Sequence, residues 1–204
     1  MLFRSILTMG AAAANERVDL ELVLAIDISG SVDADEGRLQ RDGYIKALND
    51  PEVLKAIRSG IEGKIAIAYF EWSGPETKRL LLDWTIIEDE ATAKAAAARL
   101  ASFPIRSAMS TSISGAMDYA VPMYGKAFEG HRRVLDISGD GPNNAGQLID
   151  ISRENAVSRG ITINGVPIIN NRPNVTGFPQ LADLDLYFRS EEHTSELQSR
   201  FGIS

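Results

Sequence analysis

The sequence predicts an α/β protein built on a doubly wound, mostly parallel sheet with one antiparallel edge strand. Three observations carry this prediction. Short apolar segments alternate with segments of helical spacing along the chain. Residues 20–27 are almost continuously apolar, as expected for a parallel strand covered on both faces. Residues 64–72 and 79–87 are strand-like and separated only by a short turn, which indicates an antiparallel hairpin.

The helices of the first half follow from their ends and their apolar spacing. Residues 33–50 have an acidic start, and Leu39 belongs to a set of apolar residues at helical spacing. Residues 51–60 have Pro51 at the first helical position and Gly60 at the end, an arrangement typical of a short helix. We therefore expect two consecutive helices between the first two strands.

The second half repeats the alternation. Residues 88–103 are rich in alanine and have acids in the first turn, where the helix dipole favours negative charge. Residues 111–124 and 146–160 have helical spacing, whereas 132–138 and 161–169 are apolar runs of strand length. This order predicts a further helix before each of the two last strands.

Composition limits the class of protein. The chain has 204 residues, of which 44% are hydrophobic, enough for one ordinary core. Its formal net charge is −7, and this balance argues against a nucleic-acid partner, which would require a basic surface. There is no cysteine, and only His131 and His193 could act as imidazole ligands. No apolar stretch reaches the length of a membrane span.

Both ends of the chain are predicted to lie outside the domain. Residues 189–204, beginning RSEEHTSELQS, resemble the translation of a common short-read sequencing adapter, and MLFRS at the start fits the opposite adapter. A genuine polar tail is the alternative. The small, apolar segment that follows the start ends in an Ala-x-Ala pattern and resembles the remnant of a secretory signal peptide; a frayed segment is the alternative. We therefore expect residues 1–17 and 189–204 to be extraneous and residues 18–188 to form the domain.

The same four letters, DISG, end two of the predicted strands. They occupy residues 27–30 and 136–139. In open α/β sheets, ligands bind beyond the carboxyl ends of the strands, at the point where the strand order reverses. Both segments can therefore face one crevice.

The first of these segments carries oxygen ligands. Asp27, Ser29 and Ser31 alternate, so their side chains can turn to the same side as the chain leaves the strand. One carboxylate and two hydroxyls suit a hard divalent cation such as Mg²⁺, whereas soft metals favour His or Cys. The sequence thus predicts a Mg²⁺ site, with Mn²⁺ or Ca²⁺ as other occupants.

The segment Asp27-Ile28-Ser29-Gly30-Ser31 resembles the metal-ion-dependent adhesion site of von Willebrand factor A-type domains. That family also has a threonine opening a later helix and an aspartate before a glycine after the fourth strand. Thr111 in TSISGAM and Asp140 in SGDG match both features in order and context. The resemblance covers roughly residues 18–170, and DISGDGPNN is most similar to an exported, uncharacterised bacterial subfamily.

The resemblance implies a Rossmann-like fold and a set of metal ligands. By analogy, Ser29, Ser31 and Thr111 contact the metal directly, Asp27 and Asp140 act largely through water, and a carboxylate of a partner protein completes the shell. It also implies a final helix and edge strand, which the segment LADLDLYF before residue 189 leaves incomplete. We therefore expect a C-terminally truncated domain that is less stable than the native gene product.

Several residues have alternative interpretations. Ser29, Ser31 and Thr111 could instead cap the helices that follow them. Asp136 could orient Thr111 or a water, or pair with a neighbouring arginine, Arg132 or Arg133. Asn143 and Asn144 are expected in a turn, His131 at the surface, and Trp72 in the core rather than exposed for partner recognition.

Two functions compete at this point. The first is a non-enzymatic binding module, periplasmic or secreted, that holds Mg²⁺ and engages an acidic group of a protein partner. The alternative is a Mg²⁺-dependent phosphatase or phosphotransferase, which also begins from an aspartate after the first strand. Such enzymes usually have a second aspartate two residues later, where this chain has Ser29. The sequence offers no nucleophile–base pair, and this favours binding over catalysis.

Overall fold

The computed structural model describes residues 15–30, 32 and 34–168. The predicted ligand Ser31 and both predicted extraneous ends, apart from residues 15–17, lie outside these ranges. The described chain forms one five-stranded sheet of order β3-β2-β1-β4-β5. The strands are β1 (Glu16–Asp27), β2 (Ile65–Trp72), β3 (Lys78–Ile87), β4 (Phe128–Gly139) and β5 (Ile161–Pro167). Only β3 runs antiparallel, at one edge, so the predicted sheet is confirmed.

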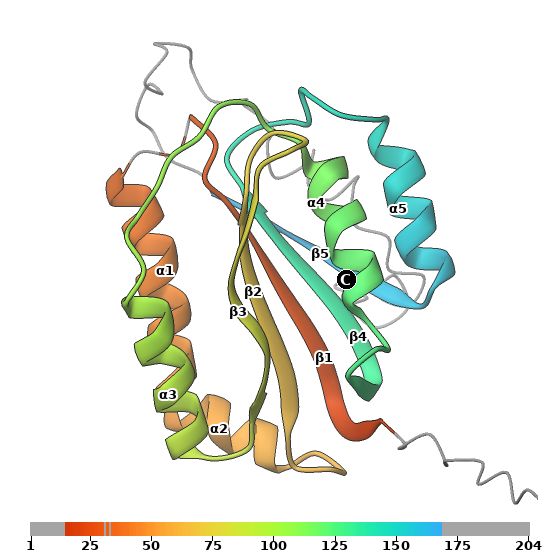
Figure 1. The fold of residues 1–204 in the computed structure, drawn as a ribbon. Helices are drawn as coiled ribbons and strands as arrows, with labels where there is room; N and C mark the ends of the chain where they lie inside the picture. Colours follow the sequence, from red (N-terminus) through yellow and green to blue (C-terminus); the bar gives the residue numbers. More distant parts are fainter. Residues whose placement is uncertain (1–14, 31, 33, 169–204) are drawn as a thin grey trace, which may run out of the picture.

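Helices cover both faces of this sheet (Figure 1). They are α1 (Ala34–Leu48), α2 (Pro51–Arg58), α3 (Glu90–Ala101), α4 (Ile113–Ala120) and α5 (Ile149–Ser158), with a 3-10 turn at Val121–Met123. The first three lie on one face, and α4 and α5 lie on the other. All five predicted helices are confirmed, within a few residues at their ends. No helix in the described ranges has the length and apolar character needed to cross a bilayer.

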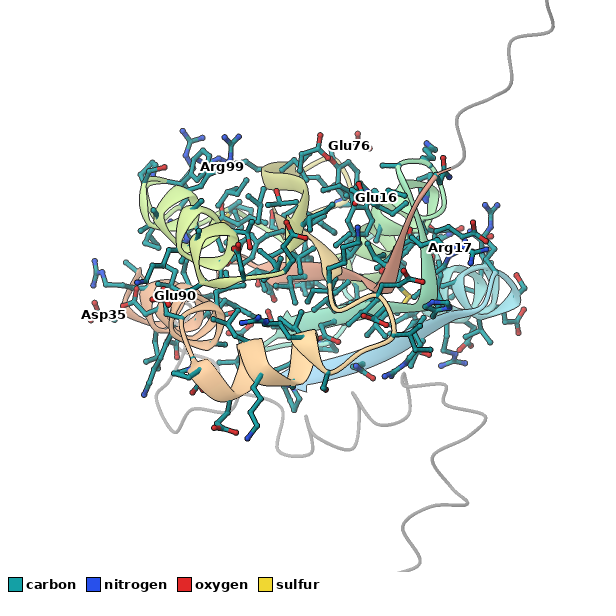
Figure 2. The ribbon with its side chains drawn as sticks, turned by 90° about the horizontal axis from the view of Figure 1, so that it is seen from below. Glu16, Arg17, Asp35, Glu76, Glu90 and Arg99 are labelled. Carbon is teal, nitrogen blue, oxygen red and sulfur yellow. The ribbon has the colours of Figure 1, made fainter. Side chains whose placement is uncertain are left out.

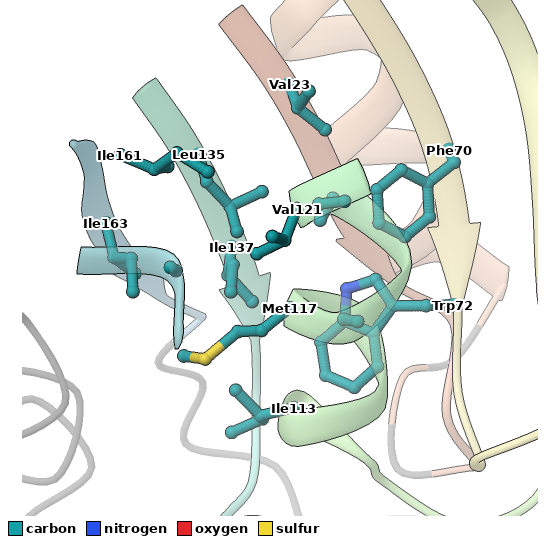
Figure 3. Close-up of a cluster of buried hydrophobic side chains, with 14 of the residues drawn as sticks. Val23, Phe70, Trp72, Ile113, Met117, Val121, Leu135, Ile137, Ile161 and Ile163 are labelled. Atoms are coloured by element: carbon teal, nitrogen blue, oxygen red, sulfur yellow. The ribbon is translucent and has the colours of Figure 1, made fainter. Parts of the chain in front are cut away.

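The sheet separates two apolar cores. Alternation along β1 sends Val23 to the core under α4 and α5 and Leu24 to the core under α1 and α3. The α4 core is shown in Figure 3, where Trp72 from β2 and Met117 from α4 belong to the same buried cluster. Trp72 has 0% exposure, so it is a core residue and its alternative role in partner recognition is wrong.

Strands β1 and β4 begin earlier than the apolar runs indicate. Their first halves carry charged residues, including the buried Glu21. The carboxylate of Glu21 accepts hydrogen bonds from the backbone N–H groups of Gly125, at 2.8 Å, and Gly130, at 2.9 Å. Arg133 Nε lies 3.3 Å from Glu21 Oε1 and balances its charge. These bonds stabilise a charged segment within the sheet. The apolar pattern of the sequence does not predict them, because they join residues far apart in the chain.

Most charged side chains remain at the periphery. Figure 2 shows Glu16, Asp35, Glu76 and Glu90 around the outside of the layers, and all four are exposed. His131 is also at the surface, as predicted, with Nε2 3.0 Å from Glu62 Oε1. These charged side chains are therefore solvated.

The carboxyl ends of β1, β2 and β4 meet at one end of the sheet, the upper end in Figure 1. Asp27 at the end of β1 is in register with Trp72 at the end of β2. The β2–β3 turn, the segment before α4 and the loop after β4 reach the same end. Four chain segments thus converge where the sequence predicts a ligand.

Candidate metal centre

The centre begins at the end of β1. Asp27 and Ser29 both have 0% exposure. The backbone N–H of Ser29 donates to Asp27 Oδ1 at 2.7 Å, which turns the chain sharply as it leaves the strand. The carbonyl of Ile28 accepts from the N–H of Ala108 at 2.8 Å, and this bond ties the turn to the segment before α4.

The buried surroundings of Asp27 disfavour an ionised carboxylate. Burial raises its pKa to about 7, and the nearby Asp140 carboxylate also raises it, although the N–H groups of Ser29 and Asp140 act in the opposite direction. Its second oxygen, Oδ2, has no hydrogen-bond partner among the described residues. A buried carboxylate oxygen of this kind requires a proton or a cation, so Asp27 fits a metal ion.

Thr111 lies in the segment before α4 and is 4% exposed. Its backbone is clamped to the loop after β4: the Thr111 N–H donates to Asn144 Oδ1 at 2.9 Å, and its carbonyl accepts from the Asn144 N–H at 2.9 Å. The residue before it, Ser110, has a φ of +67° and is the only non-glycine residue with positive φ in the described chain. A strained backbone kept in place by several contacts is typical of functional sites.

Thr111 does not cap α4, so that interpretation is wrong. The cap is Ser112, whose Oγ accepts from the N–H of Gly115 at 3.2 Å. The N–H of Ser112 itself donates to the carbonyl of Ser73 at 2.8 Å, which joins the segment to the β2–β3 turn. The hydroxyl of Thr111 therefore does not act as the N-cap of α4.

Asp140 follows β4 directly and is 5% exposed. Both its carboxylate and its backbone amide act electrostatically on Asp27, so the two aspartates are neighbours. The same loop then reaches Thr111 through Asn144. The structure thus links Ser29 and Asp140 each to Asp27, and it ties the Thr111 segment to the loop that carries Asp140.

Asn143 and Asn144 are more than turn residues. Besides the Asn144 clamp, Asn143 Oδ1 accepts from the backbone N–H of Ser114 at 3.1 Å. The sequence predicts only a turn at these two positions, because an Asn-Asn pair after Gly-Pro is an ordinary turn signal. Their side chains in fact fasten the loop after β4 to the start of α4.

Among the described residues Asp136 contacts neither Thr111 nor an arginine through a hydrogen bond or ion pair, and its partner is on β5. Its Oδ1 accepts from the side-chain amide of Asn164 on β5 at 2.7 Å. Since Ile137 points into the α4 core, Asp136 faces the opposite side of the sheet, away from the Thr111 segment. Burial raises the pKa of Asp136, and the bond from Asn164 lowers it.

The donor set at this end of the sheet consists of hydroxyl and carboxylate oxygens. Within the described ranges, no three His, Cys, Asp or Glu side chains are grouped so that they could hold a metal ion by themselves. Any metal at Asp27 and Asp140 must therefore use hydroxyl, backbone or water oxygens as well, and such a shell suits a hard divalent cation.

A cavity of about 570 Å³ opens beside Ser112. It is bordered by Lys78 from the hairpin, Asp118 from α4 and Gly146 from the loop after β4. Gly146 has a φ of +89°, and a Cβ there would lie 2.5 Å from Ser112 Oγ. Only glycine therefore allows the loop to approach α4 this closely.

A family model matches residues 17–194 of the chain, and its description is "Protein of unknown function (DUF1194)". The chain belongs to the DUF1194 family. No curated protein matches it.

Solved structures show that this DUF1194 chain has the von Willebrand factor A-type fold. A von Willebrand factor type A protein from Catenulispora acidiphila matches with a TM-score of 0.52 and 14% identity, over 74% of this chain and 33% of that one. The conserved hypothetical protein BatB from Bacteroides thetaiotaomicron matches with a TM-score of 0.56 and 16% identity, over 88% and 94% of the two chains.

A third similar structure is proximal thread matrix protein 1 from the mussel byssus, described with a zinc-occupied MIDAS motif. It matches with a TM-score of 0.59 and 13% identity, over 76% of this chain and 39% of that one. At these identities the similarity establishes the fold of the DUF1194 chain and leaves its ligands to be argued from its own residues.

Proposed function

We propose that this protein is a metal-dependent protein-binding module whose ligand set is Asp27, Ser29, Ser31, Thr111 and Asp140. The observation that carries the proposal is the state of Asp27. Its carboxylate is fully buried, one oxygen has no described partner, and a second carboxylate lies beside it. A bound divalent cation would offset the cost of the buried charge, satisfy the oxygen that lacks a partner, and reduce the repulsion between the two carboxylates.

The ion we propose is Mg²⁺, with Mn²⁺ or Ca²⁺ able to replace it. Mg²⁺ is bound through one or two carboxylates and keeps several waters, which fits two aspartates among hydroxyl groups. The divalent ion in the MIDAS motif of the mussel protein supports a cation at this place in the fold. When bound, the ion would supply a Lewis-acidic position open to a ligand from outside.

The partner we propose is a protein that supplies a carboxylate to the open coordination position. The chain has a net charge of −7, so an acidic partner would be repelled in the absence of the cation. Association would then depend on the metal. The Ala-x-Ala segment near the start supports a periplasmic or secreted site of action.

Binding is favoured over phosphoryl transfer by the residue two positions after Asp27. A phosphatase of this architecture would use an acid/base carboxylate there, and this chain has the buried hydroxyl of Ser29. The proposed function is therefore a non-enzymatic one.

Calorimetric titration of Mg²⁺ and Mn²⁺ into the full chain tests the proposal. We expect one site per chain in the wild type and at least a tenfold loss of affinity in Asp27→Asn and in Ser29→Ala. The first change removes the buried charge, whereas the second removes only a hydroxyl and keeps the backbone bond to Asp27.

The matched control is Asp83→Asn, which removes an exposed carboxylate from β3. It should leave the affinity unchanged. A folded wild type that binds neither ion, or equal losses in the control and in Asp27→Asn, would refute the proposed metal site.

A further inference from the structure

An exposed apolar side chain lies directly on the proposed metal-binding loop. Met109 is 80% exposed, although it belongs to a segment that packs against that loop. A Cβ built on Gly30 would lie 3.7 Å from Met109 Sδ, so the thioether covers the position between Ser29 and Ser31. A partner that reaches the metal must therefore pass beside Met109.

The backbone around Met109 is fixed rather than free. The segment passes between two glycines: a Cβ on Gly30 would lie 3.4 Å from the Ala108 carbonyl oxygen, and one on Gly74 would lie 3.3 Å from the Met109 carbonyl oxygen. The bond from Ala108 to Ile28 and the positive φ of Ser110 complete the restraint. Hence the exposure of Met109 is imposed by the surrounding backbone.

We propose that Met109 is the apolar contact for the partner, and that the partner's metal-binding acidic residue is flanked by an aliphatic side chain. This inference rests on the proposed function. Methionine is unbranched and polarisable, so it adapts to the shape of such a side chain. An apolar group that is already held in place beside a charged anchor adds affinity without a large ordering cost.

Two end-blocked peptides test the inference on the full, Mn²⁺-loaded chain. They are acetyl-Gly-Glu-Gly-amide and acetyl-Leu-Glu-Leu-amide, which share one carboxylate and differ in the flanking side chains. Binding is followed through the relaxation of water protons, because a carboxylate on Mn²⁺ displaces bound water. We expect the leucine peptide to bind about tenfold more tightly, as partial burial of one leucine predicts.

Variants of Met109 test the apolar contact without changing the proposed metal ligands. In Met109→Gln the two peptides should bind equally, and in Met109→Leu the preference should return. Ile61→Gln is the matched control, since Ile61 is 86% exposed and lies before β2, at the opposite end of the sheet. It should keep the tenfold preference.

The outcomes distinguish this inference from the proposed function. Normal Mn²⁺ binding with equal affinity for the two peptides in the wild type overturns the role of Met109 and leaves the metal site standing. A preference that survives in Met109→Gln also overturns it. Failure of the wild type to bind Mn²⁺ removes both ideas together.

Discussion

At the scale of single residues, the burial of Asp27 makes the stability of the folded chain depend on pH. An unfolded chain ionises this carboxyl freely above pH 4, whereas burial raises the folded pKa to about 7. Between these values the folded state binds more protons than the unfolded state, so the free energy of unfolding falls as the pH rises. This loss of stability is complete once the pH exceeds the pKa of Asp27 in the folded state.

This linkage predicts a pH-dependent difference between the wild type and Asp27→Asn. In EDTA, the free energy of unfolding of the wild type should fall relative to the variant between pH 5 and pH 8, by on the order of 2–4 kcal/mol. Urea denaturation at several pH values measures it. The other carboxyl groups are common to both chains, so parallel curves would show that Asp27 ionises normally.

Single residues also explain what the sequence could reveal about the site. Asp27 and Ser29 are predicted as ligands from a local pattern, because oxygen-bearing side chains follow an apolar strand, whereas Thr111 and Asp140 are predicted only through the resemblance to von Willebrand factor A-type domains. The contributions of Asn144 and Met109 were not predictable, because each depends on a contact with a loop distant in sequence. The partner of Asp136 was missed because Asn164 reaches it only through the pairing of β4 and β5.

At the scale of elements, a buried group of charges joins α1, β2 and β3. Arg41 on α1 is 4% exposed and pairs with Glu71 on β2, which is 2% exposed. Arg79 on β3 lies 3.2 Å from the other oxygen of Glu71, and its guanidinium stacks 5.2 Å from the centre of the Phe103 ring. Arg41 also donates to the carbonyl of Phe103, so the group holds the start of the segment that leads to Thr111.

Breaking this group should be costly. Arg41→Ala leaves Glu71 buried with only the partial compensation of Arg79, and we expect a loss of about 3 kcal/mol in the free energy of unfolding. The matched control is Lys94→Ala, which breaks the exposed Lys94–Glu90 pair on α3 and should change stability by less than about 0.5 kcal/mol. Chemical denaturation compares the two, and equal effects would contradict a structural role for the buried pair.

At the scale of the whole molecule, we expect binding of the proposed metal to be coupled to folding. The proposed ligands come from the β1 loop, the segment before α4 and the loop after β4, so the unfolded chain cannot present them together. A ligand that binds only the folded state stabilises it by about 2.7 kcal/mol at one hundred times its Kd.

We therefore expect Mg²⁺ at that concentration to raise the thermal midpoint by several degrees at pH 8. Asp27→Asn should show no rise, and in EDTA it should melt above the wild type, because it lacks the buried charge. Differential scanning calorimetry with and without Mg²⁺ measures both effects. The control Asp83→Asn should gain as much as the wild type, and a wild type that gains nothing from Mg²⁺ would contradict the coupling.

The sequence by itself determined the order of helices and strands and the mostly parallel sheet, and it predicts an oxygen-rich site at the strand ends. These features are local, because apolar runs specify strands, capping residues specify helix ends, and oxygen-bearing side chains cluster in short turns. Only the tertiary structure decided that Ser112 rather than Thr111 caps α4, and that Met109 stands exposed over Gly30. Those outcomes depend on which loops come into contact beyond the strand ends, and long-range packing determines these contacts.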